Sequence, residues 1–167
     1  MRRAALAVEC RGRTSRTVPP MTRITRWARA ALGARGAGCE LALQIVGPAR
    51  MRELNHHYRG KDRPTNVLSF PAAPAPGVQP QPLGDVVICP AVLQQEARAQ
   101  GKPAEAHWAH LVVHGVLHLA GYDHEIDADA RRMERREIAV LRGLGFPNPY
   151  IPRDAAPARV RAGVRHV

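Results

Sequence analysis

Apolar side chains recur along this chain with two different spacings, and each spacing predicts one type of secondary structure. Short runs of adjacent apolar residues bounded by turn formers predict strands, whereas apolar residues at every third or fourth position predict amphipathic helices. Strands are expected at residues 4–10, 41–46, 67–70 and 86–89. Helices are expected at residues 19–33, 49–58, 91–100, 104–120 and 126–143.

The order of these elements predicts the fold class. Strands and helices are mixed in the first ninety residues and only helices follow, which indicates an α+β fold. We expect one domain over residues 1–150, with a small four-stranded mixed sheet backed by about five helices. The strand at 86–89 is apolar throughout and should be central in the sheet. Residues 1–20 are expected to be a partly flexible basic leader, 71–82 a proline-rich loop, and 151–167 a disordered basic tail.

The composition argues against a membrane protein and a secreted protein, and it favours a partner with negative charge. Apolar runs are far shorter than the ~18 residues that a membrane span needs, and the run Ala4–Val8 is too short for a signal peptide. The 3 scattered cysteines predict reduced thiols in a cytoplasmic protein. The net charge of +11 favours a polyanionic partner, although a GC-rich genome would also enrich arginine. The oligomeric state stays open.

The most informative segment is HGVLHLAGYDH, residues 114–124. On a helix, His114 and His118 lie on the same face, one turn apart. Gly121 can take a positive φ, end the helix and turn the chain so that His124 returns as a third ligand. Three neutral imidazoles with a fourth position left for water are typical of catalytic zinc sites. The segment therefore predicts one Zn²⁺ per chain, at the end of the central helix.

Two alternatives accompany this metal site. The histidines could be a row of polar packing groups without a metal, and His107 and His110 are interpreted as structural groups or as partners of the ligands. The same histidine spacing also occurs in metzincin peptidases, where a glutamate after the first histidine is the general base. Here that position is Gly115, which has no proton acceptor. Peptide hydrolysis is therefore the weaker alternative.

A second polar segment, YRGKDRPTNVLSFP at residues 58–71, joins a helix end to a strand. Its cations Arg59, Lys61 and Arg63 alternate with turn-forming residues, so their charges can cluster on a fixed backbone. Such a turn beside a metal would suit an anionic substrate, because the arginine fork binds two phosphoryl oxygens. The alternative is a solvated turn whose cations pair with Asp62.

These two segments, with LGDVVIC between them, closely resemble the YbeY family of bacterial metal-dependent endoribonucleases, also called rRNA maturation factors. The resemblance runs from about Leu41 to Tyr150. It implies cleavage of single-stranded RNA, including the 3′ end of 16S rRNA, and a part in ribosome maturation and quality control on the small subunit. It also implies that Arg59 is important for activity and that one zinc ion is held by His114, His118 and His124.

Other residues receive weaker interpretations. Arg59 would stabilise negative charge on the phosphoryl oxygens, and Lys61 and Arg63 would bind RNA. With glycine at the base position, the proton acceptor must lie elsewhere. Asp123 is interpreted as orienting the neighbouring ligand or capping a helix, and Asp85 as a partner of the site or a turn residue. A non-catalytic ribosome-associated factor with structural zinc, and a hydrolase of small phosphoesters, remain rival functions.

Overall fold

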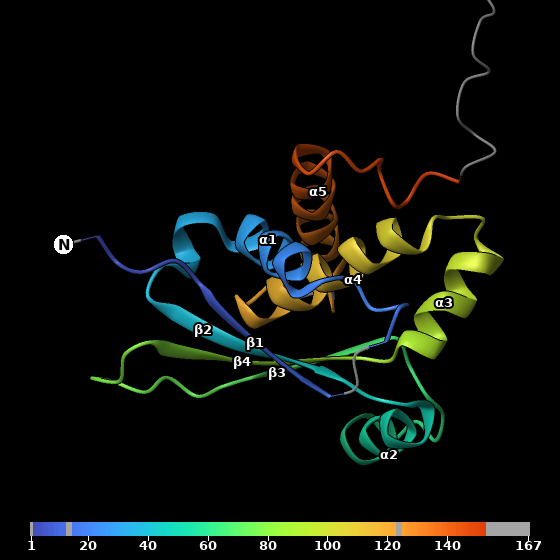
Figure 1. Cartoon of the computed structure of the whole chain (residues 1–167), viewed down its shortest axis with the longest axis horizontal. Helices are drawn as coiled ribbons and strands as arrows, with labels where there is room; N and C mark the ends of the chain where they lie inside the picture. The colour runs from blue at the N-terminus through green and yellow to red at the C-terminus, as the bar shows by residue number, and fades with distance from the viewer. Residues whose placement is uncertain (1, 13–14, 123–124, 153–167) are drawn as a thin grey trace, which may run out of the picture.

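The computed structural model describes residues 2–12, 15–122 and 125–152, which form a four-stranded sheet and five α-helices (Figure 1). This confirms the predicted α+β class and the mixed sheet. The sheet order is β1-β2-β4-β3. β1 and β4 both pair with β2 in parallel, and β3 pairs with β4 in antiparallel. The strands are β1 (Ala7–Gly12), β2 (Cys39–Ile45), β3 (Val67–Pro71) and β4 (Gln81–Ile88).

The helices follow the apolar periodicity closely, and their observed bounds differ from the expected ones by at most two residues. A short 3₁₀ helix, Gly33–Gly36, continues the first of them. The α-helices are α1 (Met21–Leu32), α2 (Pro48–Arg59), α3 (Pro90–Ala99), α4 (Ala104–Leu119) and α5 (Asp127–Gly143). Among the described ranges, no helix is both long and apolar enough to cross a membrane.

Two strand predictions were wrong in their bounds. β1 extends to Gly12 because Arg11 and Gly12 pair with β2, although this part was expected to be a basic link. β4 begins at Gln81, inside the expected proline-rich loop. Pro82 is tolerated there because the pairing of β4 with β3 starts only at Gly84, and the register with β2 shifts at the same level. Proline in sheets is found at such edges and bulges.

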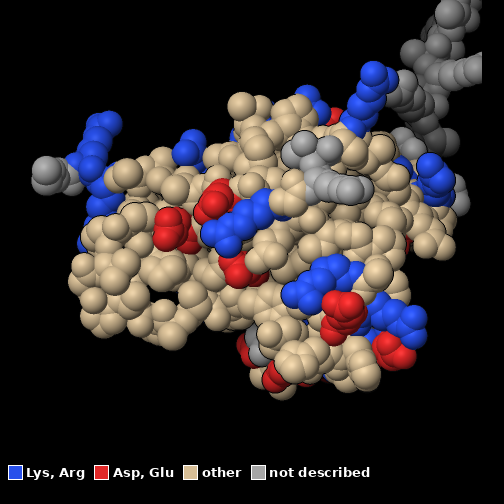
Figure 2. Space-filling model, turned by 60° about the horizontal axis from the view of Figure 1, so that its bottom comes forward, with Lys and Arg blue, Asp and Glu red and all other residues tan. Residues whose placement is uncertain are grey.

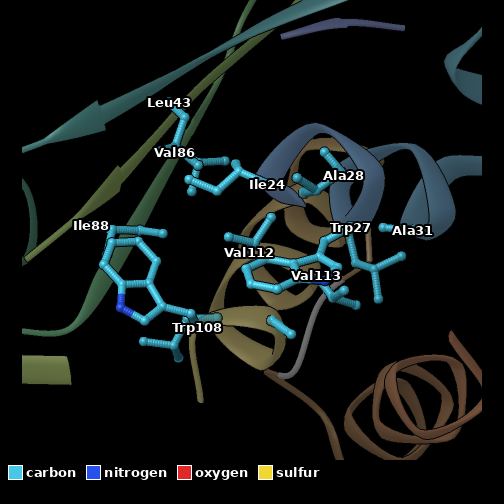
Figure 3. Packing of buried hydrophobic residues seen from close by; sticks show 14 of the residues in the cluster. Ile24, Trp27, Ala28, Ala31, Leu43, Val86, Ile88, Trp108, Val112 and Val113 are labelled. Atoms are coloured by element: carbon cyan, nitrogen blue, oxygen red, sulfur yellow. The ribbon is translucent and has the colours of Figure 1, made fainter. Parts of the chain in front are cut away.

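The sheet separates two layers of helices. One face carries α1, α4 and α5, and the other carries α2 (Figure 1). β2 and β4 turn alternate side chains to the α4 face, where they meet α1 and α4 in the main core (Figure 3). The labelled residues of this core are Leu43, Val86, Ile88, Ile24, Trp27, Ala28, Ala31, Trp108, Val112 and Val113. Burial of each valine, leucine or isoleucine side chain in this core contributes about 1.5–3 kcal/mol.

Helix α4 is the central element of the domain. It contacts α1, α3, α5, β3 and β4, and ten of its sixteen residues are buried. Because apolar contacts fix α4 from several sides, the polar side chains it carries are held on a rigid support. The few polar residues of this buried helix therefore stand in well-defined positions, as a functional site requires.

Candidate metal centre

Four histidines of α4 form one continuous row, which we call the histidine row: His107, His110, His114 and His118. Neighbouring ring centroids lie 6.2, 6.1 and 4.7 Å apart along it. The exposed fraction of the side chain rises from 4% at His107 to 14% at His110 and 26% at His114. The row therefore begins in the core and reaches solvent at the C-terminal end of α4.

The two described histidines of the expected zinc site are adjacent. The rings of His114 and His118 are 4.7 Å apart between centroids and inclined by 76°. Gly121 has the positive φ expected of it, 93°, and α4 ends two residues before it. His124 and Asp123 lie outside the described residues, so the third ligand and its neighbour stay predictions.

A buried carboxylate that the sequence analysis did not identify completes the centre. Glu137, from α5, is 0% exposed. Its Oε1 accepts a hydrogen bond from Nδ1 of His114 at 2.6 Å. Its Oε2 accepts one from Nε2 of His110 at 2.8 Å and another from the hydroxyl of Tyr150. One glutamate thus joins α4, α5 and the segment after α5.

A sequence signal for Glu137 exists. The buried residues of α5 are Met133, Glu137, Val140 and Leu141, spaced as the apolar face of an amphipathic helix. Glu137 is therefore a charged residue at a core position. Such residues are rarely fully buried unless they are paired. A carboxylate on the apolar face of α5 predicts a buried partner, but the sequence does not identify the partner residue.

The ionisation of these groups follows from their surroundings. Burial would raise the pKa of Glu137, but the hydrogen bonds from His110 and His114 outweigh it and lower that pKa to about 2. Burial lowers the pKa of His110 despite the carboxylate beside it. Burial and Glu137 together raise the pKa of Tyr150 above its usual range. At neutral pH, an ionised carboxylate therefore accepts hydrogen bonds from a neutral imidazole and a neutral phenol.

A second imidazole–carboxylate pair, between the buried His107 and the half-buried Glu96, lies one turn before His110. Nε2 of His107 is 2.8 Å from Oε2 of Glu96, and the amide of Asn66 donates to the same oxygen at 3.0 Å. These groups, with His110, His114 and Tyr150, line a cavity of about 300 Å³. The cavity lies beside the histidine row, and most of the residues that line it are polar.

The described residues contain one group of donors that could hold a metal ion. Donor atoms of His110, His114 and Glu137 all lie within 4.8 Å of one another. In a first arrangement these three residues would hold the ion together. In a second, Glu137 keeps its hydrogen bond to Nδ1 of His114, and Nε2 of that ring would be the ligand. The second arrangement agrees with the interpretation of His110 as a partner rather than a ligand.

Close packing explains the glycine that follows His114. A Cβ atom at Gly115 would lie 2.6 Å from Cγ1 of Val86, inside van der Waals contact. The carbonyl of Gly115 accepts a hydrogen bond from Oγ of Ser69 at 2.9 Å. Position 115 therefore faces the sheet and has no room for a side chain. A glutamate base of the metzincin type does not fit there.

The cationic segment at the C-terminal end of α2 is exposed at Arg59, the last helical residue, and at Lys61 and Arg63 in the turn that follows. Asp62, expected as their partner in the solvated alternative, instead binds Arg52 at 2.8 and 3.0 Å. In the part of the chain that the structure describes, none of the three cations pairs with a carboxylate. Elsewhere the charges are mixed: on the face in Figure 2, Lys and Arg lie among carboxylates rather than in one continuous patch.

The turn and Asp85 differ in how they relate to the histidine row. The chain runs from the turn through Asn66 and Val67, which line the cavity beside the row. Asp85 alternates in β4 with Val86, which packs against the α4 side, so Asp85 faces the opposite side of the sheet. The structure therefore does not bring Asp85 to the histidines, and its interpretation as a partner of the site finds no support.

Comparisons with known proteins point to one family. Residues 13–145 match the sequence model of the family described as Endoribonuclease YbeY. The protein of that name from Alkalilimnicola ehrlichii is 55% identical over 137 residues, covering 80% of this chain and 82% of the relative. That of Methylococcus capsulatus is 55% identical over 133 residues, covering 80% and 87%. The solution structure of TM1509 from Thermotoga maritima is similar in fold, with a TM-score of 0.54, 25% identity and coverage of 84% and 91%.

Proposed function

The chain belongs to the YbeY family of endoribonucleases, and from this premise we propose that it is a zinc-dependent endoribonuclease that cleaves single-stranded RNA. The proposed role is rRNA processing in the cytoplasm, at the 3′ end of 16S rRNA, with a part in quality control on the small ribosomal subunit. The observation that carries the proposal is the adjacent pair His114 and His118 at the open end of a buried helix, with a buried carboxylate behind the first ring.

The described residues suit a zinc ion. Because the protonated Nδ1 of His114 donates a hydrogen bond to the ionised Glu137, the lone pair of that ring resides on Nε2, as a metal ligand requires. Neutral imidazole nitrogens are donors that Zn²⁺ prefers. In the proposal, the ion is held by His114, His118 and His124. When bound, it supplies a Lewis acid beside the phosphodiester group.

The chain's own cations would place the RNA. Arg59 binds two phosphoryl oxygens through its planar fork and stabilises the negative charge that grows on them during cleavage. Lys61 and Arg63 bind neighbouring phosphates. The pairing of Asp62 with Arg52 supports this role, because Asp62 then does not neutralise Arg59, Lys61 or Arg63.

The rival functions are separated by different observations. The contact of position 115 with Val86 argues against a peptidase that needs a glutamate there. A non-catalytic factor with structural zinc would hold its metal away from solvent. Here the exposed fraction of the side chain increases from His107 through His110 to His114, the expected ligand. His110, His114 and Glu137 are a second group that could bind the cation. If they bind it, replacing Glu137 should remove the metal, because Glu137 would then be a ligand.

The test uses the purified full-length chain, analysed for zinc and incubated in parallel with single-stranded RNA, duplex RNA and casein. We expect one zinc per chain and cleavage of single-stranded RNA alone. Chelation should abolish cleavage while the circular dichroism spectrum stays that of a folded protein. A zinc-loaded chain that leaves RNA intact would refute the proposal, and unfolding on chelation would favour the structural-zinc alternative.

A further inference from the structure

Glu137 distributes its hydrogen bonds unevenly between its two oxygens. Oε1 accepts only from His114, among the contacts described, at 2.6 Å. Oε2 accepts from both His110 and Tyr150. A fully buried carboxylate is costly unless its lone pairs are satisfied, and three donors satisfy it here. The proposed function uses none of these contacts beyond the first.

The two donors on Oε2 come from different parts of the fold. His110 lies on α4, one turn before His114. Tyr150 lies after α5, in a segment that Lys102 also holds, since its ammonium group donates to the carbonyl of Pro149 at 2.6 Å. Donors fixed on separate elements restrain the carboxylate plane about Oε2. Because that plane is restrained, Oε1 is aimed at Nδ1 of His114.

We propose that Glu137 is the positioning residue of the metal centre, which holds His114 in the tautomer that is protonated on Nδ1 and so presents Nε2 to the cation. His110 and Tyr150 act through Glu137, as anchors of its second oxygen. The inference rests on the proposed function in one respect, namely that His114 is a metal ligand. Carboxylates behind ligating histidines typically strengthen metal binding by about 10–100-fold.

Two measurements test the tautomer and the affinity separately. In the metal-free protein, long-range ¹H–¹⁵N correlation spectra report which ring nitrogen of His114 carries the proton. Zinc affinity follows from competition with a chromophoric chelator. In Glu137→Gln we expect a mixture of the two His114 tautomers, and an affinity lowered about 10–100-fold with one zinc still bound at saturation. In Tyr150→Phe, which loses one anchor, we expect a decrease of about fivefold, typical of one hydrogen bond.

Glu96→Gln is the matched control, since it alters the other carboxylate–imidazole pair of α4, at 2.8 Å from His107. It should leave both the His114 tautomer and the zinc affinity unchanged, and a thermal melt of each variant reports whether it is folded. If Glu137→Gln does not fold, the test passes to Tyr150→Phe, where the same two measurements apply.

The outcomes distinguish the competing explanations. An unchanged His114 tautomer with zinc affinity unchanged within twofold, in a folded Glu137 variant, would overturn the proposal. Loss of all zinc at saturation with the tautomer retained would overturn it in favour of Glu137 as a direct ligand beside His110. A wild-type protein that shows the expected tautomer but binds no zinc would refute the proposed function and leave the assignment of Glu137 to His114 intact.

Discussion

The contact between Gly115 and the sheet predicts that the smallest possible side chain at this position is harmful. In Gly115→Ala, the new Cβ would lie 2.6 Å from Cγ1 of Val86, and 3.3 Å from Oγ of Ser69 and Cγ2 of Val67. Carbon atoms normally approach to about 3.5–4.0 Å, so the buried Val86 side chain, or the packing of α4 on β4, must shift by roughly 1 Å. Overpacking of this kind costs about 1–3 kcal/mol, and a contact this short in a buried site belongs at the upper end of that range, about 3 kcal/mol.

Helix propensity works in the other direction. Alanine is favoured over glycine in a helix interior by about 1 kcal/mol, so the net loss in free energy of unfolding should be about 2 kcal/mol. For a chain of this size, that corresponds to a decrease in Tm of roughly 4–8 °C. Gly143→Ala, in α5, is the matched control, because a Cβ there meets nothing within 4 Å. It should leave Tm unchanged or raise it slightly.

A double-mutant cycle with Val86→Ala identifies the cause. Val86→Ala alone should cost about 2 kcal/mol through the cavity that it leaves. With both substitutions, the alanine at 115 occupies that cavity, so the combined loss should be smaller than the sum by at least about 1 kcal/mol. Urea unfolding followed by circular dichroism measures all four proteins. Full stability of Gly115→Ala, or strict additivity in the cycle, would refute the packing explanation.

The remaining predictions concern the metal, the substrate and pH. His118→Ala should lose bound zinc and RNA cleavage together while remaining folded, and stoichiometric zinc by plasma emission would exclude His118 as a ligand. Arg59→Glu should abolish cleavage with zinc content and Tm unchanged, whereas Arg50→Glu, on the same helix, should retain cleavage; equal turnover of the two variants would remove Arg59 from the mechanism. The pKa of Glu96 is lowered because the hydrogen bonds from His107 and Asn66 outweigh burial, so its stabilising contribution is present above the unfolded pKa near 4.5 and is lost as pH falls through the folded value. The loss of stability in Glu96→Gln should therefore shrink between pH 7 and pH 3, and a constant difference in urea unfolding would contradict this.

The sequence predicted the fold well where local periodicity decides the structure. All helices and strands were found, because each buries one face and its spacing shows which. The start of β4 was missed because proline was taken to exclude a strand. At Pro82, β4 pairs with β2 only, and proline is tolerated where one side of a strand is unpaired. The sheet face on which Asp85 lies depends on register, which local sequence does not fix.

The candidate site divides in the same way. The spacing of His114 and His118 is local, so a helix brings them together without information from elsewhere. Glu137 reaches His114 across a separation of 23 residues, and Tyr150 reaches Glu137 across 13, where α5 and the segment after it pack against α4. No spacing rule covers such contacts. A charged residue in an apolar row could have been recognised as unusual, but its partner depends on tertiary structure.

The bonds made by Pro149 and Tyr150 bear on where the working unit of this protein ends. The family match stops at residue 145 and the last helix at Gly143, yet Lys102 and Glu137 both bind the chain beyond that point. A shortened version trimmed at the helix would look complete by secondary structure and by homology. It would nevertheless admit water to a carboxylate that is otherwise sealed, so any truncation or fusion should leave the chain intact through Tyr150.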